Sequence, residues 1–166
     1  LGLASGDVVM DDVYRGKPVT SIAKKALSGS AKLTSFTVGK YVKTIGDSAF
    51  ARCPELLTVT IPESVTSIGE HAFQSCKQLQ SITLPDSLKR VGSSAFRNTA
   101  AYNDPQNQEG KLIYLGNWLI ACTAYWTDIT VREGTVCIAG GVGYRAQSVF
   151  IPASVRYLSN SALQDL

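Results

Sequence analysis

Residues 56–79 read LLTVTIPESVTSIGEHAFQSCKQL, and most of this pattern recurs on both sides of them at an interval of 23 residues. The clearest marker is the alanine, which returns in four successive copies. The columns that align in this way are Ala26, Ala49, Ala72 and Ala95; Ile22, Ile45, Ile68 and Val91; Val19, Val42, Val65 and Leu88; and Leu27, Phe50, Phe73 and Phe96. A constant interval of this length is typical of stacked supersecondary units, so the sequence predicts a repeat array.

Each copy can be interpreted as one short structural unit. Residues 56–61 follow the pattern Leu-x-x-Val-x-Ile, which predicts a strand, and Pro62 ends it because proline cannot donate to a ladder. Residues 65–68 predict a second extended piece, after which Gly69 would permit a backbone bend. Residues 72–79 carry apolar side chains three and four positions apart, which predicts a single helical or 3₁₀ turn. One unit cannot bury its own apolar side chains, so we expect the units to share a continuous core.

The full motif, Leu-x-x-Val-x-Ile-Pro-x-Ser-Val-x-x-Ile-Gly-x-x-Ala-Phe-x-x-Cys-x-x-Leu, resembles the BspA-like class of leucine-rich repeat, which is found chiefly in bacterial surface and secreted proteins. The resemblance implies a β-rich α/β solenoid, right-handed, whose parallel strands line a concave face. It also implies adhesion or recognition rather than catalysis, and the family has no shared catalytic residues to carry over. We expect a single domain over residues 1–166, with regular repeats over 19–101, an inserted hairpin over 102–125 and degenerate repeats over 126–166.

The insertion has its own signature. Residues 111–115 and 118–122 are apolar runs joined by Gly116-Asn117, which predicts two strands connected by a two-residue turn. Two strands are only marginally stable alone, so we expect the hairpin to pack onto the array. The segment also concentrates aromatic residues, which either pack the hairpin or form a patch that stacks on a sugar or anchors a protein partner. The candidate patch consists of Tyr114, Trp118, Tyr125 and Trp126, with Tyr102 nearby.

Strand alternation predicts a second candidate surface. If Val59 and Ile61 point inward, then Thr58 and Thr60 point outward, and equivalent positions in the other units follow the same rule. The resulting ladder contains Ser35, Thr37, Thr58, Thr60, Ser81, Thr83 and Thr130, together with Asp128. These side chains either solvate an exposed sheet or form a polar strip that binds an extended partner, weakly at each repeat.

Composition and charge restrict the classes of function. Only 17% of the 166 residues are charged and the net charge is +3, which is too mild for a nucleic-acid footprint. No apolar run reaches the roughly 18 residues of a membrane span. The first residues, Leu-Gly-Leu-Ala-Ser-Gly, do not form an intact signal peptide, so we expect a mature form or a piece of a longer protein.

Motifs for catalysis and metal binding are absent from the sequence. It has no Gly-x-Ser-x-Gly, no phosphate-binding loop and no His-Glu-x-x-His, and residues 140–143, Gly-Gly-Val-Gly, are better interpreted as a degenerate repeat. The one histidine, His71, is expected to face solvent, so no zinc ligand set exists. Cys53 and Cys76 occupy the same slot of consecutive units, where they are either small buried thiols or, since the strand spacing is about 4.8 Å, a possible bridge. We expect no enzyme activity, no cofactor and no metal.

Three functional hypotheses follow. The first is a protein-binding or adhesion module of a bacterial surface or secreted protein, located outside the cell or on its surface, that recognises host or neighbouring-cell macromolecules. The second is a structural spacer in a longer surface protein. The third is a glycan-binding module that uses the aromatic side chains of the inserted hairpin. No nucleic-acid partner and no direct membrane insertion are expected.

Overall fold

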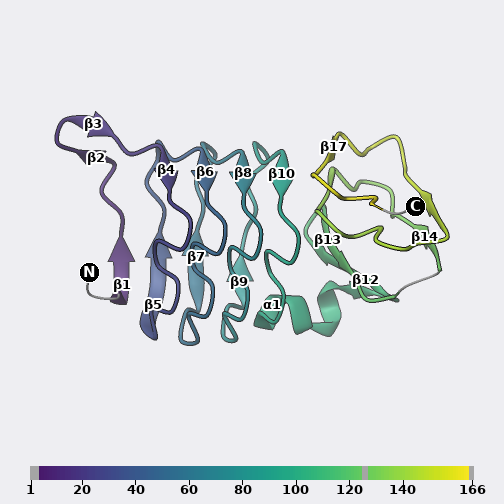
Figure 1. Ribbon diagram of the computed structural model, residues 1–166, viewed down its shortest axis with the longest axis horizontal. Coiled ribbons are helices and arrows are strands. Elements are labelled where there is room, and N and C mark those ends of the chain that lie inside the picture. The colour runs from purple at the N-terminus through teal and green to yellow at the C-terminus, as the bar shows by residue number, and fades with distance from the viewer. Residues whose placement is uncertain (1–3, 125–126, 165–166) are drawn as a thin grey trace.

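The computed structural model describes residues 4–124 and 127–164. Nearly all of its regular structure consists of very short strands, which are labelled in Figure 1. The strands before the insertion are β1 (Ser5–Val9), β2 (Val13–Tyr14), β3 (Lys17–Pro18), β4 (Ser21–Ile22), β5 (Lys32–Thr37), β6 (Thr44–Ile45), β7 (Thr58–Thr60), β8 (Ser67–Ile68), β9 (Ser81–Ile82) and β10 (Arg90–Val91). The later elements are α1 (Ala100–Asn103), η1 (Pro105–Asn107), β11 (Gln108–Glu109), β12 (Leu112–Leu115), β13 (Trp118–Cys122), β14 (Asp128–Thr130), β15 (Cys137–Ile138), β16 (Ser148–Phe150) and β17 (Tyr157–Leu158).

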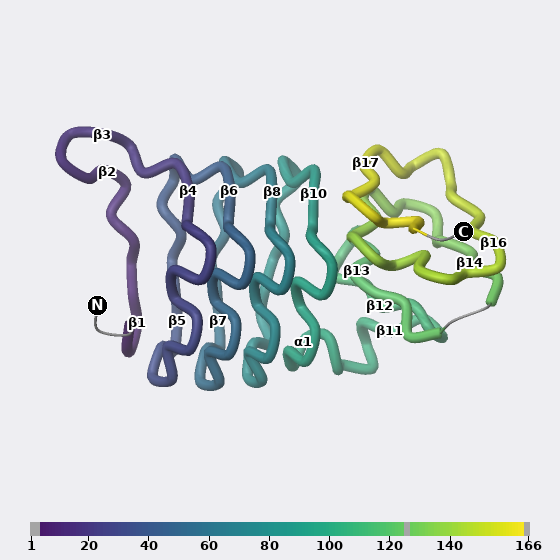
Figure 2. Tube along the Cα trace, viewed as in Figure 1, coloured from purple at the N-terminus to yellow at the C-terminus, as the bar shows by residue number. Residues whose placement is uncertain are grey.

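The predicted solenoid is confirmed. Two parallel sheets run along the first stack of turns, one ordered β1-β5-β7-β9 and the other β10-β8-β6-β4. The chain descends along β4, β6 and β8 in front and ascends along β5 and β7 behind while it advances from left to right, which makes a right-handed coil (Figures 1 and 2). Neighbouring strands pair with the 23-residue register of the sequence, as in Thr44↔Ser67 and Thr58↔Ser81. The repeat interval therefore fixes which residues stack.

The side of each turn that carries the Ala-Phe pair is not a helix, so that prediction is wrong. Two residues of each complete turn have left-handed backbone conformations, for example Ser48 (φ 53°) and Arg52 (φ 61°), and His71 (φ 55°) and Ser75 (φ 63°) in the next turn. A left-handed residue interrupts a right-handed helix. Alternate amides of this side instead donate to the following turn, as Ser48 N does to the Glu70 carbonyl, Phe50 N to the Ala72 carbonyl and Arg52 N to the Gln74 carbonyl, each at 2.8 Å. This side of the coil is thus a third hydrogen-bonded ladder between turns.

The motif glycine has a different role from the predicted bend. Gly46, Gly69 and Gly92 do not have positive φ angles. A Cβ added at Gly69 would lie 2.5 Å from the Asp47 amide nitrogen, and one at Gly92 would lie 2.4 Å from the Glu70 amide nitrogen. The glycine is therefore required because the backbones of successive turns approach each other closely.

A single row of aromatic rings forms the centre of the core. Phe50 and Phe73 are stacked with centroids 5.1 Å apart, and Phe73 and Phe96 are stacked at 5.5 Å. Phe36 contacts the first ring of this row edge-on at 4.9 Å. Since Phe50, Phe73 and Phe96 are almost completely buried, the row joins three successive turns into one core.

The cysteine column packs beside this row. Cys53 and Cys76 are free and buried, and their thiols donate to the carbonyls of Leu27 at 3.2 Å and Phe50 at 3.0 Å. The interpretation as small buried thiols is confirmed. The hydrogen bond with Cys53, together with burial, raises the pKa of the Cys76 thiol far above its usual range. Such a thiol stays protonated and unreactive.

The inserted hairpin is present where it was predicted. Strands β12 and β13 pair antiparallel, with Leu115 opposite Trp118 across the Gly116-Asn117 turn. Strand β13 also pairs in parallel with β15, and β15 with β17, so the hairpin opens a second stack of turns. The chain in this second stack runs largely across the page in Figure 2, whereas it runs up and down the page in the first stack.

The two stacks are joined directly by hydrogen bonds. Gly140 N donates to the Val91 carbonyl at 2.9 Å, and Val91 N donates to the Ser159 hydroxyl at 2.9 Å. A Cβ at Gly141 would lie 2.9 Å from the Ser93 hydroxyl. The glycines of residues 140–143 therefore lie in a turn of a degenerate repeat, as predicted, and they allow the second stack to sit against the first. Among the described residues no helix is long and apolar enough to cross a membrane.

Candidate functional site

The outward face of the β1-β5-β7-β9 sheet carries most of the predicted hydroxyl ladder. Pairing places Ser35, Thr58 and Ser81 in one column and Thr37 and Thr60 in the next. The residue between them on β7, Val59, is buried, so the alternation of inward and outward side chains is as predicted. Parallel strands lie about 4.8 Å apart, so each column repeats a hydroxyl at that interval.

The members of the ladder differ in exposure. Thr58, Thr60, Ser81 and Thr83 are exposed, and none of their hydroxyls is hydrogen-bonded to another group of the described chain. Thr130 is exposed too, but it lies on β14, which pairs only with β16 in a separate two-stranded sheet. Its place in a continuous ladder was therefore predicted wrongly, because the insertion separates the two sheets.

The N-terminal strand covers the first end of the ladder. Asp7 on β1 accepts hydrogen bonds from the hydroxyls of Ser35 at 2.7 Å and Thr34 at 2.9 Å. Ser35 and Thr37 are consequently half-buried and less available to a partner. The sequence analysis missed β1, since it placed the first partial unit at Val19.

Two carboxylates, those of Asp7 and Asp12, attach this N-terminal segment to residues 34–40 of the next turn. The Ser35 and Thr34 hydroxyls lower the pKa of Asp7, and the backbone and side-chain nitrogens of Lys40 lower the pKa of Asp12. A carboxyl whose folded pKa lies below its unfolded value of about 3.9 stabilises the fold above that value, and the stabilisation is lost as the pH falls through the folded pKa. Strand β1 should therefore loosen in acid while the central turns persist.

Hydrogen exchange tests this pH dependence. We expect the protection of the Met10 amide, which donates to the Thr37 carbonyl, to fall between about pH 5 and about pH 2.5 after correction for intrinsic rates. Protection of the Phe73 amide should remain. In a variant carrying Asp7→Asn and Asp12→Asn, Met10 protection should be low throughout and independent of pH; a persistent pH dependence there would contradict the assignment.

The predicted aromatic patch is wrong for its two described members. Tyr114 and Trp118 are 2% and 5% exposed, so neither ring is available to a ligand. The hairpin is covered on both faces: the Arg132 guanidinium lies 4.2 Å from the Tyr114 ring centroid, and the Tyr114 hydroxyl accepts from the Arg132 amide. Tyr125 and Trp126 lie outside the described residues, so the prediction for them stays a prediction.

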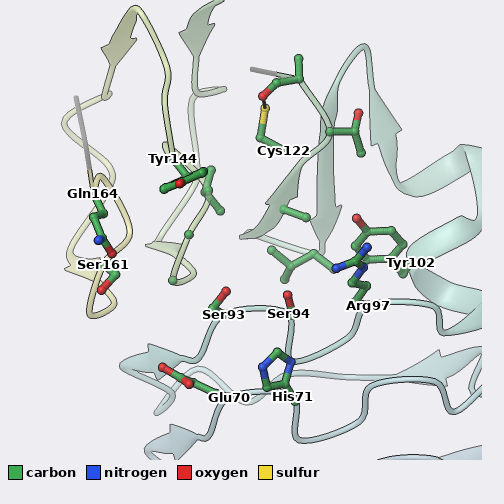
Figure 3. Close-up of a pocket in the computed structure, with 17 residues that line it drawn as sticks. Glu70, His71, Ser93, Ser94, Arg97, Tyr102, Cys122, Tyr144, Ser161 and Gln164 are labelled. Carbon is green, nitrogen blue, oxygen red and sulfur yellow. Dashed lines mark hydrogen bonds between the residues drawn. The ribbon is translucent and has the colours of Figure 1, made fainter. Parts of the chain in front are cut away.

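A cleft at the junction of the two stacks was not predicted from the sequence. It has a volume of about 590 Å³ and is lined by the first stack, the end of the hairpin and the second stack (Figure 3). His71 lines its floor and is half-buried rather than solvent-facing as predicted. The Nδ1 atom of His71 is buried and has no hydrogen-bond partner in the described part of the chain. Within residues 4–124 and 127–164, no group of His, Cys, Asp and Glu could hold a metal ion.

The family is decided by comparison with known repeats. The BspA type Leucine rich repeat region matches the chain in 6 copies, over residues 10–123 and 45–166. The chain belongs to the BspA-type leucine-rich repeat family. The resemblance of the motif and the geometry of the coil are thereby confirmed, and the matched copies extend through the inserted hairpin and the degenerate turns.

Solved structures of leucine-rich repeat proteins share the fold. The T. pallidum leucine rich repeat protein is 22% identical, with a TM-score of 0.58 over 94% of this chain and 70% of that chain. A leucine-rich repeat protein from Bacteroides ovatus is 26% identical, with a TM-score of 0.58 over 92% of this chain and 36% of that chain. A leucine rich cell surface protein from Faecalibacterium prausnitzii is 24% identical, with a TM-score of 0.55 over 94% of this chain and 39% of that chain. The chain therefore spans well under half the length of the last two. No curated protein matches it.

Proposed function

We propose that this BspA-type repeat protein is a non-catalytic binding module of a bacterial surface or secreted protein, and that it adheres to host or neighbouring-cell proteins. The observation that supports this most is the exposed, regular array of hydroxyls on β7 and β9, which lacks partners within the described chain. Solenoids use such extended strips to bind extended partners. A surface location is supported by the structural relative from F. prausnitzii, which is named a cell surface protein.

The expected affinity of a single module is low. The exposed part of the ladder consists of Thr58, Thr60, Ser81 and Thr83, whose side chains are small and uncharged. Strong interfaces are instead anchored by Trp, Tyr and Arg. Binding through such a strip gains strength when several modules act together. The proposal therefore suits adhesion, in which many copies act at once.

A substitution series on the ladder tests the proposal. We expect a triple variant, Thr58→Lys, Thr60→Lys and Thr83→Lys, to weaken saturable binding to extracellular-matrix-type proteins by about tenfold or more, since three ammonium groups would block the strip. The readout is surface plasmon resonance with immobilised, multivalent protein.

A charge-matched control separates position from charge. Thr20→Lys, Ser21→Lys and Ala23→Lys change three exposed residues in and around β4, which belongs to the other sheet, and should leave binding almost unchanged. Equal binding by both triple variants would contradict a role for the ladder. Absence of saturable binding by the unchanged protein would contradict the adhesion role and favour the spacer.

A further inference from the structure

We propose that the cleft at the junction of the two stacks binds a neutral saccharide, such as the terminal units of a glycan. Its volume of about 590 Å³ falls within the range of about 300–1,000 Å³ typical of small-ligand sites. It lies where the solenoid changes direction, and three segments distant in sequence meet there. This site is separate from the hydroxyl ladder and from the buried hairpin aromatics.

The charges of the lining indicate a neutral ligand. Besides His71, the ionisable acidic and basic side chains that line the cleft are Glu70 and Arg97, so their formal charges cancel. In the column of Glu70, the preceding turns hold Lys24 and Asp47, which pair with each other at 3.6 Å. The Glu70 carboxylate forms no ion pair among the described residues. A balanced acid and guanidinium do not concentrate phosphate or nucleotide, but both hydrogen-bond neutral hydroxyl groups.

The uncharged groups of the lining fit a polyhydroxylated ligand. The side chains of Ser93, Ser94, Ser161 and Gln164 line the cleft and form no hydrogen bond to another group of the described residues. Each of these side chains can both donate and accept, which matches sugar hydroxyls that do the same.

Aromatic rings complete the walls. Figure 3 shows Tyr144 on one side of the cleft and Tyr102 beside Arg97 on the other, with His71 and Ser94 between them on the floor. A tyrosine presents an apolar ring and a polar hydroxyl together, which suits the mixed apolar and polar faces of a sugar ring.

The frame of the cleft is preorganised by backbone hydrogen bonds. His71 N donates to the Ser93 carbonyl at 3.0 Å, which fixes the floor, and Gly141 N donates to the Ser161 carbonyl at 2.8 Å, which fixes the opposite wall. Gly140 and Gly141 lack a Cβ that would clash with Ser93, so the two walls can meet at this point. A cleft that is already formed loses less free energy to ordering when a ligand binds.

Chemical-shift mapping of the whole ¹⁵N-labelled chain tests the proposal. The probes are lactose, maltotriose and chitotriose, with inorganic phosphate as the anionic comparison, each at about 10 mM because weak sites saturate in the millimolar range. We expect at least one saccharide to shift the amides of Ser93, Ser94 and Gly141, and phosphate to leave them unchanged. No response from these amides to any of the three saccharides, or a response to phosphate alone, would overturn the proposal.

Substitutions identify the site of any saccharide binding. Arg97→Gln should weaken binding about tenfold, and Thr123→Trp, which fills the cleft from the hairpin wall, should abolish it. Arg52→Gln changes an exposed arginine outside the cleft and should have no effect. If Thr123→Trp disturbs folding, Arg97→Gln still tests whether the saccharide binds in the cleft, provided that the NMR spectrum of this second variant is otherwise native. Saccharide binding that survives Arg97→Gln unchanged would overturn the proposal, whereas loss of protein binding in the ladder variant would not affect it.

Discussion

Phe73→Ala should lower the free energy of unfolding by about 3–5 kcal/mol, as truncations of large buried aromatic side chains do. Phe73 is completely buried, and its ring stacks on Phe50 at 5.1 Å and on Phe96 at 5.5 Å. The substitution leaves a cavity and removes both ring contacts of the row at once. Each turn contacts only its neighbours, so the damage should spread to the turns of Phe50 and Phe96. Chemical denaturation measures the loss, and hydrogen exchange locates it.

A matched control uses a phenylalanine outside the core. Phe150 on β16 is 64% exposed, so Phe150→Ala should change stability by less than about 0.5 kcal/mol. Phe36 contacts the row on one side only, edge-on, so Phe36→Ala should cost less than Phe73→Ala. Equal stability of the Phe73→Ala and Phe150→Ala variants would be incompatible with a stacked core.

The repeat interval explains why so much of the fold could be predicted. A period of 23 residues fixes the register of every parallel pair once one pair is known, as Ser35↔Thr58 and Thr58↔Ser81 show. The hairpin was predictable for a local reason, because Gly116 adopts the positive φ that a two-residue turn requires. Both signals depend on residues that are close in sequence or equivalent by repetition.

The features that were missed depend on contacts between unlike segments. The cleft exists because the second stack is turned against the first at Ser93 and Gly141, and no repeat spacing encodes that angle. The aromatic patch was proposed because the insertion concentrates aromatic residues, but Tyr114 and Trp118 are buried and pack the hairpin, the alternative that composition alone could not distinguish. Strand β1 was missed because Ser5–Val9 carries no copy of the motif.

Gly92→Ala should destabilise the array by about 1–3 kcal/mol or more, as overpacking of a rigid interior does. The added methyl group would lie 2.4 Å from the Glu70 amide nitrogen and 2.6 Å from the Gly69 carbonyl carbon. Both atoms belong to the backbone of the preceding turn and cannot rotate away. The turns must therefore separate, which strains the hydrogen bond from Gly92 N to the Ile68 carbonyl at 2.9 Å.

Substitution by asparagine distinguishes two reasons for requiring glycine: a close approach between turns and a left-handed backbone conformation. Gly110 has a φ of 63° and open space around its Cα, so alanine there costs only the left-handed strain of about 1–2 kcal/mol and asparagine costs less. At Gly92, which lacks a positive φ, asparagine should be at least as harmful as alanine because the clash is steric. Denaturant melts of the four variants measure the difference. Rescue by asparagine at Gly92 would show instead that a backbone bend, and not the contact between turns, requires the motif glycine.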